Sequence, residues 1–156
     1  MKRNVNLQEL SRDHHHGLLL SWKIREGIKR NRAEGVIKEY VTYFFEKALL
    51  PHFREEEVLI LGYLSDTDRL KIQTLQEHQE IEQLVKGLNE SDNTRASLLE
   101  IGRLLECHIR FEERTLFPYI EQLLNESELA EIGEAINEDH SIFTDNYPYQ
   151  FWKYDD

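Results

Sequence analysis

The feature that most constrains this chain is a helical spacing of its apolar residues, which recur at intervals of three and four along most of the sequence. Strict alternation of apolar and polar residues, which is typical of strands, is scarce, and only seven Gly and three Pro interrupt the 156 residues. The segments between the helical patterns are short, which favours antiparallel neighbours. The sequence therefore predicts an all-α fold, an up-down-up-down four-helix bundle with a short extra C-terminal helix.

Four long helices and one short helix are expected from this spacing. They cover about residues 7–29, 36–61, 67–88, 94–124 and 127–139. Ser65 or Asp66 is the expected cap of the third helix, and Ser127 that of the short one. Pro51 falls inside the second helix, where it removes one backbone hydrogen bond, so we expect a bend or a local bulge there.

One domain is predicted over residues 1–156, because this length is near the commonest domain size and is enough to bury a core. The bundle occupies about residues 7–124 of it, and the short helix and an aromatic tail occupy residues 125–156. The tail, at residues 147–152, is expected to pack across the bundle or against a partner. The sequence itself names no protein partner.

Charge and composition exclude several classes of function. The formal net charge is -11 and the basic residues are scattered, so nucleic acid is not an expected partner. No apolar run approaches the roughly 20 residues needed to span a bilayer, and no secretory signal is visible, so we expect a cytoplasmic protein without a membrane partner. Cys107 is the single cysteine, which excludes an intramolecular disulfide and a Cys-based zinc site. Its apolar surroundings predict that it is buried.

Four of the seven histidines fall on the apolar faces of four different predicted helices. His14 points close to the mean direction of the apolar residues in the first helix. His52, His78 and His108 are spaced three, four or seven residues from apolar neighbours in the other three. Each long helix is thus predicted to direct one histidine inward, whereas His140 lies outside this set and is expected to be structural.

Two of the inward histidines have a carboxylate one turn later, Glu56 after His52 and Glu112 after His108. Residues i and i+4 share a helix face, so each pair can present a nitrogen and an oxygen to a common point. This combination suits iron, manganese or zinc. Burying such groups without a metal or other partners costs several kcal/mol each, roughly. Single pairs of this spacing also arise by chance, so the prediction rests on the whole set.

These residues, in this order, resemble the hemerythrin-like, His-His-Glu cation-binding domain family over about residues 7–124. The matching stretches are residues 11–19, 51–57, 77–80 and 107–118. The resemblance implies a helical bundle that holds two iron ions, bridged by two carboxylates and by an oxo or hydroxo group from solvent. Manganese and zinc remain alternatives to iron.

The ligands that this resemblance implies can be assigned by motif position. The terminal ligands are His14, His52, His78 and His108, and the bridging ligands are Glu56 and Glu112. Oxygen-carrying hemerythrins have a further histidine one turn earlier on the third helix, where this chain has Thr74. A glutamate, a solvent molecule or an open position is therefore expected on that iron. Four residues stay open as replacements or additions, namely His15, Glu55, Glu82 and Glu113.

The leading hypothesis is a non-haem di-iron protein that binds or senses dioxygen, nitric oxide or iron itself, with a small diatomic molecule as its ligand. One alternative is a di-iron enzyme or an iron-donating repair protein that acts on peroxide, nitric oxide or damaged iron centres. It would need an electron source, which the chain does not supply, and no catalytic residue is predicted. The other alternative is a metal-free helical interaction module, whose histidines satisfy hydrogen bonds in the core.

Overall fold

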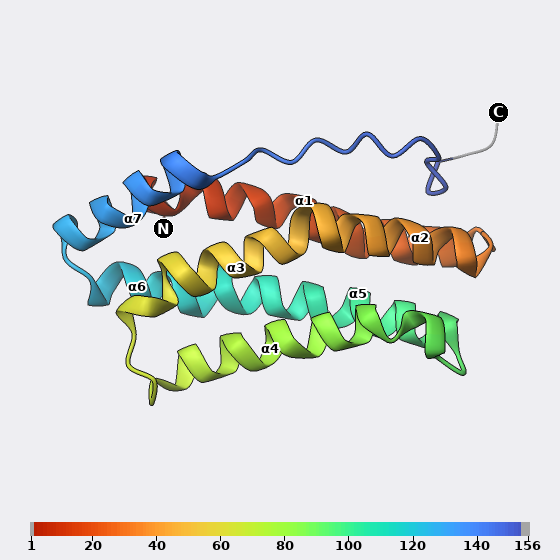
Figure 1. The fold of residues 1–156 in the computed structure, drawn as a ribbon, viewed down its shortest axis with the longest axis horizontal. Helices are drawn as coiled ribbons and strands as arrows, with labels where there is room; N and C mark the ends of the chain where they lie inside the picture. The colour runs from red at the N-terminus through yellow and green to blue at the C-terminus, as the bar shows by residue number, and fades with distance from the viewer. Residues whose placement is uncertain (1, 154–156) are drawn as a thin grey trace.

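The computed structural model describes residues 2–153, and those residues contain helices and no strands (Figure 1). The α-helices are α1 (Gln8–Lys29), α2 (Glu34–Phe44), α3 (Leu50–Leu59), α4 (Arg69–Lys86), α5 (Thr94–Phe111), α6 (Phe117–Leu123) and α7 (Glu126–Asp139). Short 3-10 turns occur at Val5–Leu7, Leu61–Tyr63 and Leu88–Glu90. The all-helical prediction is confirmed. Within the described part of the chain, the helices are all too short or too polar to cross a membrane.

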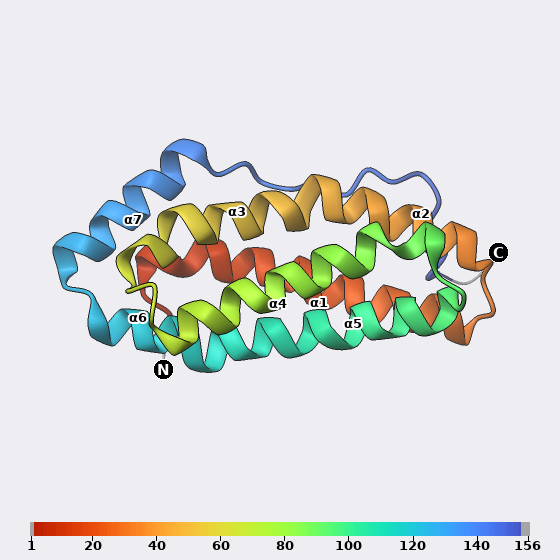
Figure 2. The same cartoon turned by 60° about the horizontal axis from the view of Figure 1, so that its bottom comes forward.

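Figures 1 and 2 show long helical rods side by side, formed by α1, by α2 with α3, by α4, and by α5 with α6. Helix α1 packs on α5 and α2, and α4 packs on α5, α3 and α2. Helix α7 lies at one end of the rods, against α3 and the first 3-10 turn. The segment after α7 then runs back along the rods toward the far end of α2.

Two π-helical turns, Phe45–Leu49 and Glu112–Leu116, join α2 to α3 and α5 to α6. Each turn ends two residues before a proline, Pro51 in one case and Pro118 in the other. A proline has no N–H to donate, and its ring clashes with the carbonyl four residues earlier. The wider π turn accommodates it without ending the rod. The bulge expected near Pro51 is confirmed, and the second bulge was not predicted.

The caps predicted for two helices were wrong. Asp68 caps α4, where its carboxylate accepts a hydrogen bond from the N–H of Leu70 at 2.8 Å. Asn125 caps α7 and exchanges hydrogen bonds with Glu128 in a capping box. The residues predicted for these places were Ser65, Asp66 and Ser127. All of these residue types cap helices well, so composition alone does not choose among neighbours.

Apolar side chains form two separate buried clusters, one on each side of a polar layer. One cluster includes Ile24 and Leu98, and the other includes Leu10, Ile60 and Ile132. The buried polar layer between them holds the six side chains that the sequence predicts as metal ligands. Buried polar groups need partners, so this layer is the place where a ligand would stabilise the fold.

The aromatic tail packs across the bundle, which is the first of the two arrangements expected for it. The ring centre of Tyr147 lies 5.1 Å from that of Tyr40 on α2. Phe151 and Trp152 are buried against the same region. Cys107, by contrast, is exposed, and its predicted burial was wrong. It precedes a buried histidine by one residue and is therefore turned about 100° away from the core.

Candidate metal centre

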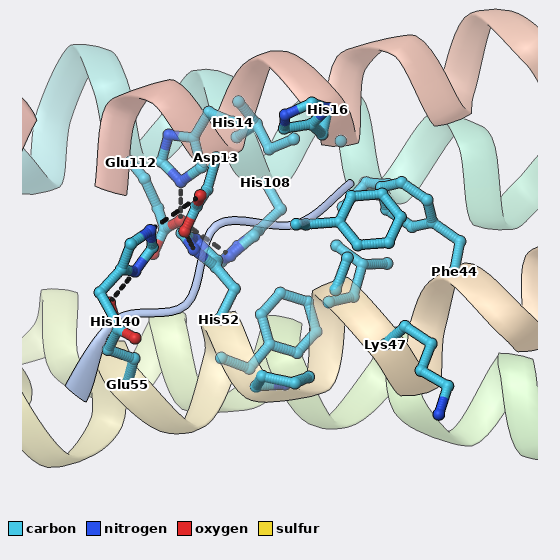
Figure 3. A pocket seen from close by; sticks show the side chains of 18 of the residues that line it. Asp13, His14, His16, Phe44, Lys47, His52, Glu55, His108, Glu112 and His140 are labelled. Carbon is cyan, nitrogen blue, oxygen red and sulfur yellow. Dashed lines mark hydrogen bonds and ion pairs between the residues drawn. The ribbon is translucent and has the colours of Figure 1, made fainter. Parts of the chain in front are cut away.

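The six side chains predicted as metal ligands converge at one place inside the bundle, four of them labelled in Figure 3. None has more than 7% of its surface exposed. They come from every rod: His14 on α1, His52 and Glu56 on α3, His78 on α4, His108 on α5 and Glu112 at the start of the second π-helical turn. The inward directions inferred from helical spacing are therefore confirmed as positions in space.

The donor atoms form two sets of four, and within each set they lie within 4.8 Å of one another. The first set is His14, His52, Glu56 and Glu112, and the second is His78, His108, Glu56 and Glu112. Both carboxylates thus belong to both sets.

One oxygen of each carboxylate lies between the two sets. Glu56 Oε1 is 3.2 Å from His52 Nε2 and 3.3 Å from His78 Nε2. Glu112 Oε1 is 3.0 Å from His14 Nε2, which is in the first set, and 3.2 Å from His108 Nε2, which is in the second. Two ligands on one ion, with bonds of about 2.1 Å, stand roughly 3.0–3.4 Å apart. The observed separations therefore match the edges of two coordination polyhedra that share both carboxylates.

Several of these buried donor atoms have no hydrogen-bond partner among the described residues. They are the Nε2 atoms of His52, His78 and His108, both carboxylate oxygens of Glu56, and Oε2 of Glu112. A buried polar atom without a partner costs about 1–3 kcal/mol. A cation is the partner that accepts both imidazole lone pairs and carboxylate oxygens. These orphaned atoms show that the residues present fit a metal.

Each inward imidazole has a second carboxylate at its other nitrogen, Nδ1. The pairs are His52 with Asp13 at 3.1 Å, His78 with Glu57 at 2.8 Å, His108 with Glu77 at 2.7 Å and His14 with Glu113 at 3.4 Å. The first three are hydrogen bonds, and the fourth is an ion-pair contact without hydrogen-bond geometry. A carboxylate at Nδ1 holds the proton there and turns the Nε2 lone pair toward the centre, as is usual for metal-bound histidines.

The four outer carboxylates link the rods in a closed ring. Asp13 of α1 reaches His52 of α3, Glu57 of α3 reaches the histidine of α4, and Glu77 of α4 reaches that of α5. Glu113, just beyond α5, contacts the histidine of α1 and closes the ring. Every rod therefore supplies both a donor to the centre and a carboxylate that orients the donor of the next rod.

Sequence reasoning missed this ring, apart from Glu113, which it held open as a ligand. A signal was present, because each outer carboxylate is adjacent in sequence to a predicted ligand. Asp13 precedes His14, for example, and Glu57 follows Glu56. An adjacent residue points about 100° away from the core of its own helix and so toward a neighbouring rod.

The remaining residues held open as ligands lie outside both sets. Glu55 accepts a hydrogen bond from His140 at 2.8 Å. Glu82 pairs with Arg54 on the surface, and His15 is exposed.

The imidazoles and carboxylates of the centre hold one another in charged forms. Burial acts to lower the pKa of His52, but the charge of Glu56 and the contacts with Glu56 and Asp13 together outweigh it and raise that pKa to about 9. Burial opposes protonation of His108 as well, and the charge of Glu112 raises its pKa to about 10. Burial acts to raise the pKa of Glu56, yet the imidazoles around it, with His52 foremost, together hold it well below the usual value. A binding cation therefore replaces protons that the metal-free site retains.

A pocket with a cavity volume of about 40 Å³ leads to the centre (Figure 3). Its lining includes His14, His52 and Glu112 at the inner end. Most of the remaining wall is apolar, formed by Phe44, Leu49, Phe53, Leu105, Ile109 and Phe143. Phe143, on the segment after α7, lies with its ring centre 5.1 Å from that of Phe44.

Comparison with known families agrees with this geometry. Residues 6–120 match the hemerythrin HHE cation binding domain family, and the chain therefore belongs to that family. Cation binding is the property this membership implies, and the buried His and Glu sets fit it. No curated protein and no solved structure matches the chain. Helix α7 and the segment after it lie outside the matched residues.

Thr74 marks the departure from the five-histidine pattern of oxygen-carrying hemerythrins. It is fully buried on α4, and its hydroxyl donates a hydrogen bond to the carbonyl of Leu70 at 2.7 Å. The hydroxyl is thus used within its own helix. Each of the two sets consequently contains two histidines and two carboxylates.

Proposed function

We propose that this chain is a non-haem di-iron protein, with one iron in each set of four donors and Glu56 and Glu112 shared between them. The scaffold we propose is an up-down-up-down bundle formed by the four rods. The observation that carries the proposal is that two sets of four buried donors share both carboxylates. Two adjacent cations account for this sharing, because a single cation leaves one set of buried nitrogens without a partner.

Each residue of the centre has a defined task in this proposal. The four histidines would bind iron through the lone pair on Nε2; they are His14, His52, His78 and His108. The two glutamates would neutralise part of the metal charge. The outer carboxylates keep the imidazoles in the tautomer that leaves Nε2 free. Bound iron would supply reversible ferrous/ferric chemistry and an exchangeable position for a small ligand.

The pocket favours a small neutral ligand such as dioxygen or nitric oxide. Much of its wall is formed by aromatic and aliphatic side chains, among them Phe53 and Ile109, which offer no hydrogen bonds to a ligand, and its polar lining includes Asp13, Glu55 and His140. The ring of Phe53 also stacks on His78, with ring centres 4.0 Å apart. We therefore propose binding or sensing of a diatomic molecule as the function. The cytoplasmic location stays a prediction from sequence.

Optical spectroscopy of the iron-loaded protein tests this function. The protein is loaded with ferrous iron without oxygen, and its absorption spectrum is recorded before and after addition of dioxygen or nitric oxide. We expect new bands with either ligand, and none in zinc-loaded protein or in the His108→Ala variant. An iron-loaded spectrum that neither dioxygen nor nitric oxide changes contradicts the proposal.

A further inference from the structure

A second group of metal-binding side chains lies beside the centre, at the edge of the same pocket (Figure 3). It consists of Asp13 on α1, Glu55 on α3 and His140, which follows α7. Their donor atoms lie within 4.8 Å of one another. His140 Nδ1 is 2.8 Å from Glu55 Oε1, and His140 Nε2 is 3.4 Å from Asp13 Oδ1.

Negative charge exceeds positive charge in this group. Among residues 2–153, neither Asp13 nor Glu55 forms an ion pair with a lysine or arginine, and each faces only imidazole nitrogens. A third carboxylate, Glu9, lies 4.0 Å from His140 Nε2 and is itself paired with Arg12.

The hydrogen bonds within this group do not compensate its excess of negative charge. A neutral imidazole carries one N–H and can donate to one of its two carboxylates, which leaves a lone pair facing the other. The 3.4 Å between Nε2 and Asp13 Oδ1 is close to the edge of a tetrahedral site with bonds of about 2.1 Å. Imidazole and carboxylate are also ligand types that suit zinc, manganese and ferrous iron.

The group is more accessible than the centre but is connected to it. The side chains of Asp13 and Glu55 are 20% and 13% exposed, whereas those of Glu56 and Glu112 are at most 1% exposed. Asp13 uses Oδ2 for His52 and leaves Oδ1 for His140, so one carboxylate joins the group to a predicted ligand of the centre. A cation held here lies on the pocket through which the centre is reached.

We propose that Asp13, Glu55 and His140 form a third cation site, which takes a divalent ion such as ferrous iron, manganese or zinc. His140 binds the ion through Nε2 beside Asp13, and Glu55 turns from Nδ1 to the ion. His140 lies outside residues 6–120, so this site is not part of the family pattern. The site holds a cation at the mouth of the pocket before it passes to the two inner sets. Its existence stands on these three side chains, and its role as an entry point rests on the proposed di-metal centre.

Zinc titration of the full chain tests the site. Bound zinc is counted by elemental analysis after equilibrium dialysis over a range of free zinc concentrations. We expect three ions per chain in the natural protein, the third held more weakly than the other two. His140→Ala and Glu55→Gln should each lose one ion and keep two. His15→Ala is the matched control, because it removes an exposed imidazole next to the centre and should keep three.

The outcomes separate this site from the centre. Saturation of the natural protein at two ions, or three ions retained in both His140→Ala and Glu55→Gln, overturns the third site. In that case the group only tethers the segment after α7 to the bundle. Loss of tight binding in Glu112→Gln, with the weak ion retained, supports both sites independently. Binding of one ion that disappears in His140→Ala but not in Glu112→Gln supports the third site and overturns the centre. Circular dichroism of each variant verifies that it is folded.

Discussion

His108 Nδ1 lies 2.7 Å from Oε1 of Glu77, across the interface between α5 and α4. This is the shortest of the four contacts between inward histidines and outer carboxylates. Burial acts to raise the pKa of Glu77, but its hydrogen bonds with His108 and Gln73, together with the nearby imidazoles, outweigh this and lower the pKa below the usual value. The pair therefore carries charge on the carboxylate and a proton on Nδ1, so that Nε2 of the same ring faces the centre.

Replacing Glu77 by Gln should weaken metal binding while the fold is kept. The amide still reaches His108 but carries no charge, and changes of this kind cost about 10–100-fold in metal affinity. Affinity is measured by competition with a chromophoric chelator. Glu80→Gln is the control, because Glu80 is exposed on the same helix and should leave affinity unchanged. Equal affinities in the two variants contradict an orienting role for Glu77.

The inward direction of the side chains in the two sets could be predicted from the sequence because one helix periodicity governs it. His52 and Glu56, or His108 and Glu112, are one turn apart on an apolar face, and the structure buries both pairs. The outer ring could not be predicted in the same way. Glu57, for instance, is out of phase with the apolar face of its own helix, and its contact depends on the position of α4.

The bends and the tail were also only partly predictable from the sequence, because their details depend on contacts between distant residues. The bulge before Pro51 was expected from the missing N–H, but the π-helical geometry of both bulges depends on how α2 and α5 continue past their prolines. The contact of His140 with Asp13 brings together residues 127 positions apart, which no local pattern specifies. Cys107 was misplaced because Leu105, His108 and Ile109 nearby in the sequence are buried, whereas its own side of α5 faces solvent.

Stability of the metal-free protein should fall as pH rises from about 6.5 to about 10. Folding raises the pKa of His52 to about 9 and that of His108 to about 10, so over this range the folded chain binds more protons than the unfolded one. A pKa difference of one corresponds to about 1.4 kcal/mol. The two histidines together correspond to an expected loss on the order of 8 kcal/mol over this range.

Urea unfolding with a chelator present, at pH 6.5 and at pH 9.5, measures this loss. In zinc-saturated protein the imidazoles bind metal in place of protons, so the decline should disappear. Stability that is the same at both pH values in the metal-free protein is evidence against the paired imidazolium and carboxylate groups.

Phe53→Ala should destabilise the protein by about 3–5 kcal/mol, the usual cost of removing a buried aromatic ring. Phe53 is 1% exposed and stacks on His78 with 12° between the ring planes. Loss of the ring also frees the imidazole to rotate, so metal affinity should fall. Both quantities are measured by urea unfolding and chelator competition. Phe53→Leu, which keeps more of the volume, should show a smaller loss of both. A variant as stable as the natural protein contradicts the packing described here.

Phe143→Ala should speed ligand entry without changing metal content. The half-buried ring lines the pocket and packs on Phe44. Stopped-flow absorption of the ferrous protein mixed with nitric oxide gives the rate of entry. Tyr149→Ala is the control on the same segment, since Tyr149 is 48% exposed and does not line the pocket. An entry rate unchanged by Phe143→Ala means that ligands reach the centre by another path.

Anomalous diffraction at the iron edge, from crystals of the iron-loaded protein, tests the central claim most directly. The account predicts two peaks, about 3.5–4 Å apart as in other two-metal sites, one bonded to His14 and His52 and the other to His78 and His108. Glu56 and Glu112 should contact both peaks. A single peak, or peaks bonded to other side chains, would contradict the shared-carboxylate centre.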